Sequence, residues 1–233
     1  TQQDISATID VNFKGTINLL HACQKIGIKA FINTGSSSEY GIKHAPMKET
    51  DTLEAAHLYG ITKGAVPLYC QMMARKFDFP VVTIRPFAVY GPFEEKGRLI
   101  PEIVTAHLNN VGPKLSNPES VRDFIFIDDL IEGYVAAIKQ IESVKGEIFN
   151  LGSGVQHSIG QIADIMGVKP LYGAAQKAQT EPKTWIADIS KAKKLLNWEP
   201  KISLEEGLKK NVEWFSAKGG SASGGKEKLN FYA

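Results

Sequence analysis

The sequence has little that would mark a disulfide-rich, metal-binding or membrane protein. Its 233 residues include only two cysteines, Cys23 and Cys70, and both lie in apolar helical patterns, which predicts buried thiols rather than a disulfide framework. No cysteine–histidine spacing is typical of zinc. No stretch approaches the ~20 apolar residues of a membrane span. We therefore expect no metal site and no membrane association.

Charge of one sign is also scarce. The formal net charge of +2 is too small to favour nucleic acid or an anionic surface as a partner. The first ten residues, TQQDISATID, have neither the basic nor the apolar part of a secretory leader, so a cytoplasmic location is expected. Apolar content of 43% with 22% charged residues is typical of a globular protein.

The hydrophobic pattern alternates between helical and strand periods. Helical spacing is found at residues 5–26, 59–77, 98–110 and 127–141, and β-branched or apolar runs at 29–35, 79–86, 123–127 and 147–154. A short helix is expected near 158–167, and two more on either side of Pro200. Pro67 conflicts with the second helix, which predicts a kink or a later start.

This alternation predicts an α/β fold with a parallel sheet covered by helices on both faces. Ligands of such sheets bind beyond the carboxyl ends of the strands. The segments expected at that edge are residues 35–38, 85–90 and 152–154.

The stretch YGITK carries the clearest chemical signal. Tyr59 and Lys63 are four residues apart and share one helix face, and Ser36 follows a strand in TGSSSEYG. A phenol is too weak an acid to act as a base at neutral pH unless a neighbouring ammonium favours its charged form. The three residues could then move a proton while a bound cofactor transfers a hydride. The alternative is a surface Tyr–Lys pair beside a serine-rich turn.

Six motifs decide between these alternatives because they occur in order. They are GSSSEYG, YGITK, RPFAVYGP, RDFIFIDDL, FNLGSG and ADISKAKKLLNWEPKISLEEGL. Together they resemble the extended short-chain dehydrogenases/reductases, and within them the nucleotide-sugar epimerases and dehydratases. The resemblance runs from about Asp10 to Phe215, nearly the whole chain.

The resemblance implies a Rossmann-type doubly wound sheet, NAD or NADP as cofactor, and a nucleoside-diphosphate sugar as substrate. It implies a homodimer formed through the helices at 5–26 and 59–77. The implied catalytic residues are Ser36, Tyr59 and Lys63. The implied cofactor-binding residues are Asn12, Thr34, Gly35, Tyr59, Lys63, Pro86 and Phe87. The implied substrate-binding residues are Ser37, Ser38, Ala88, Arg98 and Arg122.

The largest departure from the family pattern is the absence of a glycine-rich G-x-x-G-x-x-G turn, which cradles the dinucleotide pyrophosphate. We therefore expect a Rossmann-type sheet that is incomplete on its N-terminal side. Its cofactor-binding core is predicted over residues 1–90 and 122–150, with a small C-terminal substrate lobe over 91–121 and 151–215. Residues 216–233 have the composition of a flexible tail.

Other departures concern the reaction. Ala88 stands where the family usually has asparagine, and Phe126 where many relatives have histidine. Related dehydratases carry an acid just after the catalytic serine or threonine, whereas this chain has Ser37 and Ser38 there, with Glu39 one position later as an expected local cap. Epimerisation or keto reduction is therefore favoured over dehydration. A dehydratase or decarboxylase on the same scaffold, or a non-catalytic fragment without dinucleotide binding, are the alternatives.

Overall fold

A computed structural model describes residues 4–173 and 182–217, so most of the predicted tail lies outside the described residues. The chain forms two compact units, each made of segments distant in sequence. Unit 1 consists of Thr1–Val89, Val121–Gln156 and Pro182–Lys201. Unit 2 consists of Tyr90–Ser120, His157–Glu181 and Ile202–Ala233.

Unit 1 is built on a parallel sheet with the order β1-β2-β6. Its strands are β1 (Phe31–Thr34), β2 (Val81–Pro86) and β6 (Ile148–Leu151). Phe31 pairs with Val81, and Thr83 pairs with Ile148. The predicted α/β fold with a parallel sheet is confirmed.

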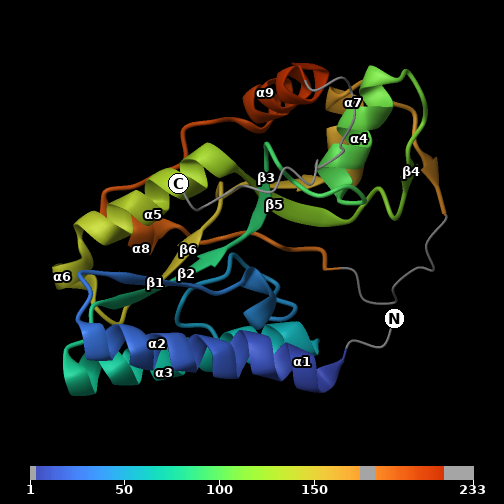
Figure 1. The fold of residues 1–233 in the computed structure, drawn as a ribbon. Coiled ribbons are helices and arrows are strands. Elements are labelled where there is room, and N and C mark those ends of the chain that lie inside the picture. The colour runs from blue at the N-terminus through green and yellow to red at the C-terminus, as the bar shows by residue number, and fades with distance from the viewer. Residues whose placement is uncertain (1–3, 174–181, 218–233) are drawn as a thin grey trace. The chain divides into compact units, whose positions relative to one another are not determined.

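Helices cover both faces of this sheet (Figure 1). One face carries α1 (Ile5–Ile9), the π-helical turn η1 (Asp10–Gly15), α2 (Thr16–Ile26) and α3 (Leu58–Phe77). The other carries α5 (Ile127–Lys139), α6 (Ile141–Val144) and α8 (Ser190–Leu196).

Successive side chains of β2 point to opposite faces of the sheet and so pack against both helix layers. Val81 packs into the core cluster beneath α3, whereas Val82 and Ile84 pack into the cluster beneath α5 and α8. All three are fully buried, which stabilises the fold by about 1.5–3 kcal/mol per side chain. The same alternation turns Arg85 toward α3, where it is also buried.

A second three-stranded sheet has the order β3 (Ala88–Tyr90), β5 (Val121–Phe126) and β7 (Gln156–Ser158). Unit 2 contains α4 (Leu99–Leu108), α7 (Ile159–Ile165) and α9 (Leu204–Ala217). It also has a small parallel pair, β4 (Lys114–Leu115) and β8 (Leu171–Tyr172). These strands of two or three residues are too short for periodicity to reveal.

The structure differs from the sequence expectations in three places. The helix predicted over 5–26 contains the π turn of η1, and α3 runs through Pro67 from Leu58 instead of starting later. Residues 182–201, predicted to belong to the substrate lobe, pack within unit 1. There the backbone N–H of Met47 donates to the carbonyl of Ile186 at 2.8 Å, and the indole of Trp198 donates to the carbonyl of Asp129 at 3.0 Å.

Candidate active site

The candidate site begins at the carboxyl end of β1, where the chain turns sharply. Ser36 has extended dihedral angles and caps a short 3₁₀ turn, η2 (Ser37–Glu39). Its hydroxyl oxygen accepts a hydrogen bond from the backbone N–H of Ser38 at 3.1 Å. That bond leaves the hydroxyl proton of Ser36 for donation to a ligand. The local sequence therefore holds the predicted catalytic serine in one orientation.

Close backbone contacts join this turn to α3. A Cβ on Gly60 would lie 2.5 Å from the carbonyl oxygen of Ser38, and a Cβ on Gly35 would lie 2.5 Å from Oε1 of Glu39. Both positions therefore admit only glycine without a shift of neighbouring atoms. The contact at Gly60 seats the first turn of α3, which carries Tyr59, against the residues that follow Ser36.

Tyr59 and Lys63 lie one helical turn apart on α3, as the spacing predicts. The ammonium of Lys63 lies 5.9 Å from the centre of the Tyr59 ring and donates to the backbone carbonyl of Thr34 at 2.9 Å. Tyr59 is 40% exposed, whereas Lys63 is half-buried. Burial lowers the pKa of Lys63, and the negative charge of Glu39 opposes that fall. Ser36, Tyr59 and Lys63 thus lie on segments in direct contact.

Asn12 supports this arrangement from the π turn. Its side-chain amide donates to the hydroxyl of Thr62 at 3.2 Å, and that hydroxyl donates to the carbonyl of Tyr59 at 2.9 Å. A π turn inserts an extra residue and re-aims the side chains around it, and such turns are frequent at functional sites. The amide of Asn12, predicted to bind cofactor, is thus linked to the start of α3.

A buried polar network beneath the turn is the main feature that the sequence did not predict. Nε of Arg85 donates to Oε2 of Glu39 at 2.6 Å, and its Nη1 donates to the hydroxyl of Tyr40 at 2.9 Å. The Tyr40 hydroxyl donates to the side-chain carbonyl of Asn150 at 2.7 Å. Burial raises the pKa of Tyr40 to about 12, so it stays a neutral donor. Glu39 does cap η2 as expected, but it also pairs with a residue 46 positions away.

The signal for this network was present in the sequence but could not be interpreted alone. Arg85 lies in an otherwise apolar strand, FPVVTIRP, where a charge needs a buried partner. Glu39 was one of several acids that could supply it, and only the fold brings the two together.

A second set of side-chain contacts in unit 1 joins Arg122, Trp185 and Ser37. The guanidinium carbon of Arg122 lies 5.4 Å from the ring centre of Trp185. The indole N–H of Trp185 donates to the hydroxyl of Ser37 at 3.3 Å. Trp185 thus links the predicted substrate-binding arginine to the turn that carries Ser36, a role that the sequence alone did not reveal.

The other predicted site residues of unit 1 are Pro86, Phe87, Thr34, Ala88 and Ser38. Pro86 ends β2, and the side chain of Phe87 is buried in a cluster with Tyr40 and Met47, so only its backbone is available to a cofactor. Thr34 bonds through its hydroxyl to that of Tyr134 at 3.0 Å. Ala88 begins β3 and is half-buried, as is Ser38.

Arg98 is the one predicted site residue in unit 2. It precedes α4, is largely exposed, and its Nε lies 3.8 Å from a carboxylate oxygen of Glu94.

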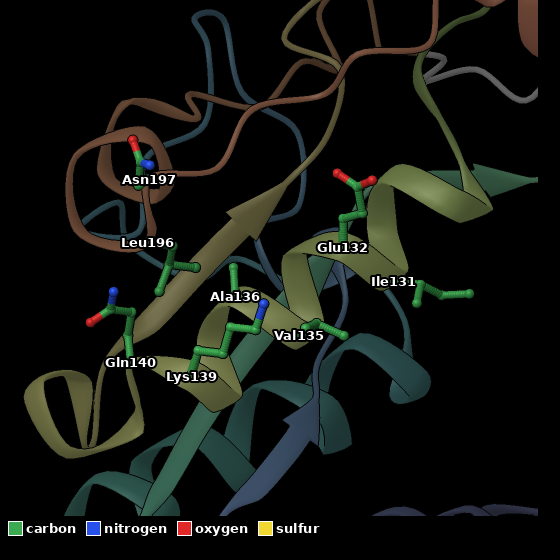
Figure 2. A pocket seen from close by; sticks show the side chains of 8 residues that line it. All are labelled: Ile131, Glu132, Val135, Ala136, Lys139, Gln140, Leu196 and Asn197. Atoms are coloured by element: carbon green, nitrogen blue, oxygen red, sulfur yellow. The ribbon is translucent and has the colours of Figure 1, made fainter.

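Within residues 4–173 and 182–217, no three acidic, histidine or cysteine side chains gather as metal ligands would, and no helix has the length and apolarity to cross a membrane. A surface hollow of about 490 Å³ lies between α5 and α8, and Figure 2 shows the side chains that line it. It is lined by Ile131, Glu132, Val135, Ala136, Lys139, Gln140, Leu196 and Asn197, none of them a predicted site residue.

Comparisons with known proteins identify the family of this chain. Residues 1–152 match the model of the NAD dependent epimerase/dehydratase family. The chain is 35% identical over 215 residues to a UDP-glucuronate 4-epimerase of Thermodesulfobacterium geofontis, covering 88% of this chain and 65% of that protein. It is 31% identical over 211 residues to an uncharacterized UDP-glucose epimerase of Bacillus subtilis, covering 88% and 66%.

A solved structure shares the fold. The UDP-glucuronic acid 4-epimerase of Bacillus cereus, in complex with UDP-glucuronic acid and NAD, has a TM-score of 0.81 at 31% identity, over 89% of this chain and 68% of that one. The chain spans about two thirds of the length of the curated relatives it matches.

Proposed function

Because this chain belongs to the NAD dependent epimerase/dehydratase family, we propose that it acts in an NAD-dependent epimerase of nucleoside-diphosphate sugars. In this proposal Tyr59 takes a proton from a ring hydroxyl of the sugar and later returns it. Ser36 donates a hydrogen bond to the same oxygen. Arg122 binds the diphosphate with its planar fork of donors.

The single observation that carries the proposal is the placement of Lys63. Its ammonium is held by the carbonyl of Thr34, at the carboxyl end of β1, on the same helix face as Tyr59. The anchor therefore holds the ammonium beside the phenol to which we assign the role of general base. A surface Tyr–Lys pair would need no such backbone anchor.

The donors in unit 1 fit the ribose end of a nicotinamide dinucleotide. After donating to Thr34, the ammonium of Lys63 keeps two N–H groups, and Tyr59 is partly exposed beside it. Bound there, the cofactor would accept and return a hydride at a ring carbon of the sugar. The sequence leaves NAD and NADP open; the matched family and the NAD complex of the Bacillus cereus relative favour NAD.

The burial of Glu39 supports epimerisation over dehydration. Elimination of water needs an acid and a base that reach the substrate. Glu39 is 0% exposed and both its oxygens accept protein hydrogen bonds, while the hydroxyl of Ser37 accepts from Trp185. Glu39 is therefore not free for that role, and the side chain of Ser37 is buried. A dehydratase or decarboxylase on the same scaffold is the second candidate.

The expected homodimer is part of this proposal. Helices α1, α2 and α3 and the turn η1 carry exposed apolar side chains, among them Ile5, Val11, Leu19, Ile26, Ile61 and Leu68. Such side chains are typical of helices that pack against a partner. The cytoplasmic location expected from the sequence stays a prediction.

The experiment that tests the proposal is product analysis. The purified protein would be incubated with NAD and, in turn, UDP-glucose, UDP-glucuronate and their 4-epimers, with products followed by NMR. We expect interconversion of one epimer pair without loss of water or carbon dioxide. A 4-keto-6-deoxy or decarboxylated product would favour the second candidate. No turnover together with no binding of NADH would contradict the proposal.

A further inference from the structure

Glu39 is a buried carboxylate that joins two parts of the candidate site. Its Oε1 accepts from the backbone N–H of Ser36 at 2.7 Å, and its Oε2 accepts from Nε of Arg85 at 2.6 Å. The side chains of Glu39 and Arg85 are 0% and 2% exposed. A buried ion pair is often no more stabilising than apolar side chains of the same volume, so overall stability alone does not account for this one.

We propose that Glu39 is a positioning residue of the epimerase site: it fixes the backbone of Ser36 and supplies the negative charge that balances the ammonium of Lys63. It does so from beneath the turn and touches no substrate. The expected effect of Glu39 on turnover rests on the proposed function. Its expected effect on the protonation of Lys63 can be measured on the protein without any ligand.

The packing around Glu39 leaves no alternative place for the carboxylate. Gly35 must lack a Cβ because that atom would lie 2.5 Å from Oε1. A Cβ built on Gly64 of α3 would lie 3.7 Å from Cβ of Glu39. The side chain is therefore enclosed between β1, β2 and α3, directly below the helix that presents Lys63.

Several charged or titratable groups lie on the elements packed around Lys63. They are Glu39 on the turn, Tyr59 on its own helix, Arg85 on β2, and Tyr134 on α5, which reaches the same residue of β1. The turn η1, which also packs against α3, carries Asp10 and Lys14, and these two are paired with each other at 2.7 Å. Burial raises the pKa of Glu39, and the guanidinium of Arg85 opposes that rise and favours the carboxylate. The pKa of Lys63 is lowered by burial and supported by this charge.

Glutamine cannot replace Glu39 without loss. Each of the two carboxylate oxygens accepts from a different donor, whereas an amide has one accepting oxygen and one N–H₂ group. In Glu39→Gln one donor therefore faces another donor, and the guanidinium of Arg85 is buried without its countercharge. We expect the melting temperature to fall by about ten degrees.

A double-mutant cycle separates positioning from stability. The variants are Glu39→Gln, Arg85→Met and the combination of both, with Tyr40→Phe as a control that removes a hydrogen bond to Arg85 but leaves Glu39 charged. The combination removes both buried charges and should regain most of the melting temperature lost in Glu39→Gln. Two further quantities are measured on each folded variant: turnover of the sugar nucleotide, and the pH midpoint of Lys63 acetylation followed by mass spectrometry with Lys25 as internal reference.

The positioning role predicts that the double variant melts near the wild type but turns over about tenfold to a hundredfold more slowly. It also predicts that the acetylation midpoint of Lys63 falls by about one pH unit in the double variant and stays in place in Tyr40→Phe, in which Glu39 keeps its countercharge. An unchanged midpoint, or turnover restored together with stability, would overturn the proposal. If the wild type catalyses nothing while the midpoint shifts as expected, the proposed function fails and the charge link between Glu39 and Lys63 stands.

Discussion

Gly60 lies against the carbonyl oxygen of Ser38 so closely that a Cβ would be 2.5 Å from it. A methyl group there must push the serine turn away from α3. We expect Gly60→Ala to lower turnover by about tenfold or more, because the turn carries Ser36 and the helix carries Tyr59. The measurement is steady-state kinetics with a sugar nucleotide, accompanied by a melting curve.

Gly64→Ala is the matched control for this substitution. It lies one turn further along α3, where a Cβ would first meet Leu53 at 3.4 Å, an ordinary contact. Alanine also favours helix over glycine by about 1 kcal/mol. We expect unchanged turnover and an equal or higher melting temperature. Equal loss of activity in both variants would show that the contact at Gly60 has no special role.

The link from Arg122 through Trp185 to Ser37 gives a second prediction. Trp185→Phe keeps an aromatic face for the guanidinium and loses the indole hydrogen bond, whereas Trp185→Leu loses both. We expect KM for the sugar nucleotide to rise by about tenfold only in the leucine variant, since cation–π and stacking contacts contribute about 1–2 kcal/mol to holding an arginine. Initial rates over a range of substrate concentrations measure this, and identical KM values in the two variants would contradict it.

The sequence predicts those features of the site that join residues close together in the chain, and it does not predict those that join distant residues. The helical pair Tyr59 and Lys63 follows from local spacing, and the position of Ser36 follows from the strand that precedes it. The bond from Lys63 to Thr34 and the pair of Arg85 with Glu39 could not be predicted, because they join segments 29 and 46 residues apart. The first joins α3 to the end of β1, and the second joins β2 to η2, so both depend on how these elements pack in the fold.

The same reasoning explains the errors in the fold. The π turn at Asp10–Gly15 shifts a helical pattern by one residue, which periodicity does not resolve over so short a stretch. Residues 182–201 lack strand or helix signals until Ser190, so their place in unit 1 depends on backbone contacts with the loop around Met47. Pro67 lies within α3 and is buried, so this helix continues through a residue that local propensity disfavours.

The exposed apolar side chains of α1–α3 give a third prediction. Leu68 is 65% exposed on α3, and a charge placed there would be desolvated in a dimer. We expect the wild type to have the mass of a dimer in light scattering and Leu68→Glu to have that of a monomer. Leu195→Glu, on α8 at 40% exposure, is the control and should remain dimeric. A monomeric wild type would contradict the proposed interface.

The central claim, that Tyr59 is the acid/base of a dinucleotide-dependent epimerase, is tested most directly by Tyr59→Phe. The phenylalanine keeps the ring beside Lys63 and removes only the hydroxyl. Epimerisation of the sugar nucleotide would be measured by NMR, and binding of NADH and substrate by fluorescence and calorimetry. We expect turnover to fall by about 10² to 10⁴-fold with both affinities preserved. Turnover equal to that of the wild type would contradict the assignment.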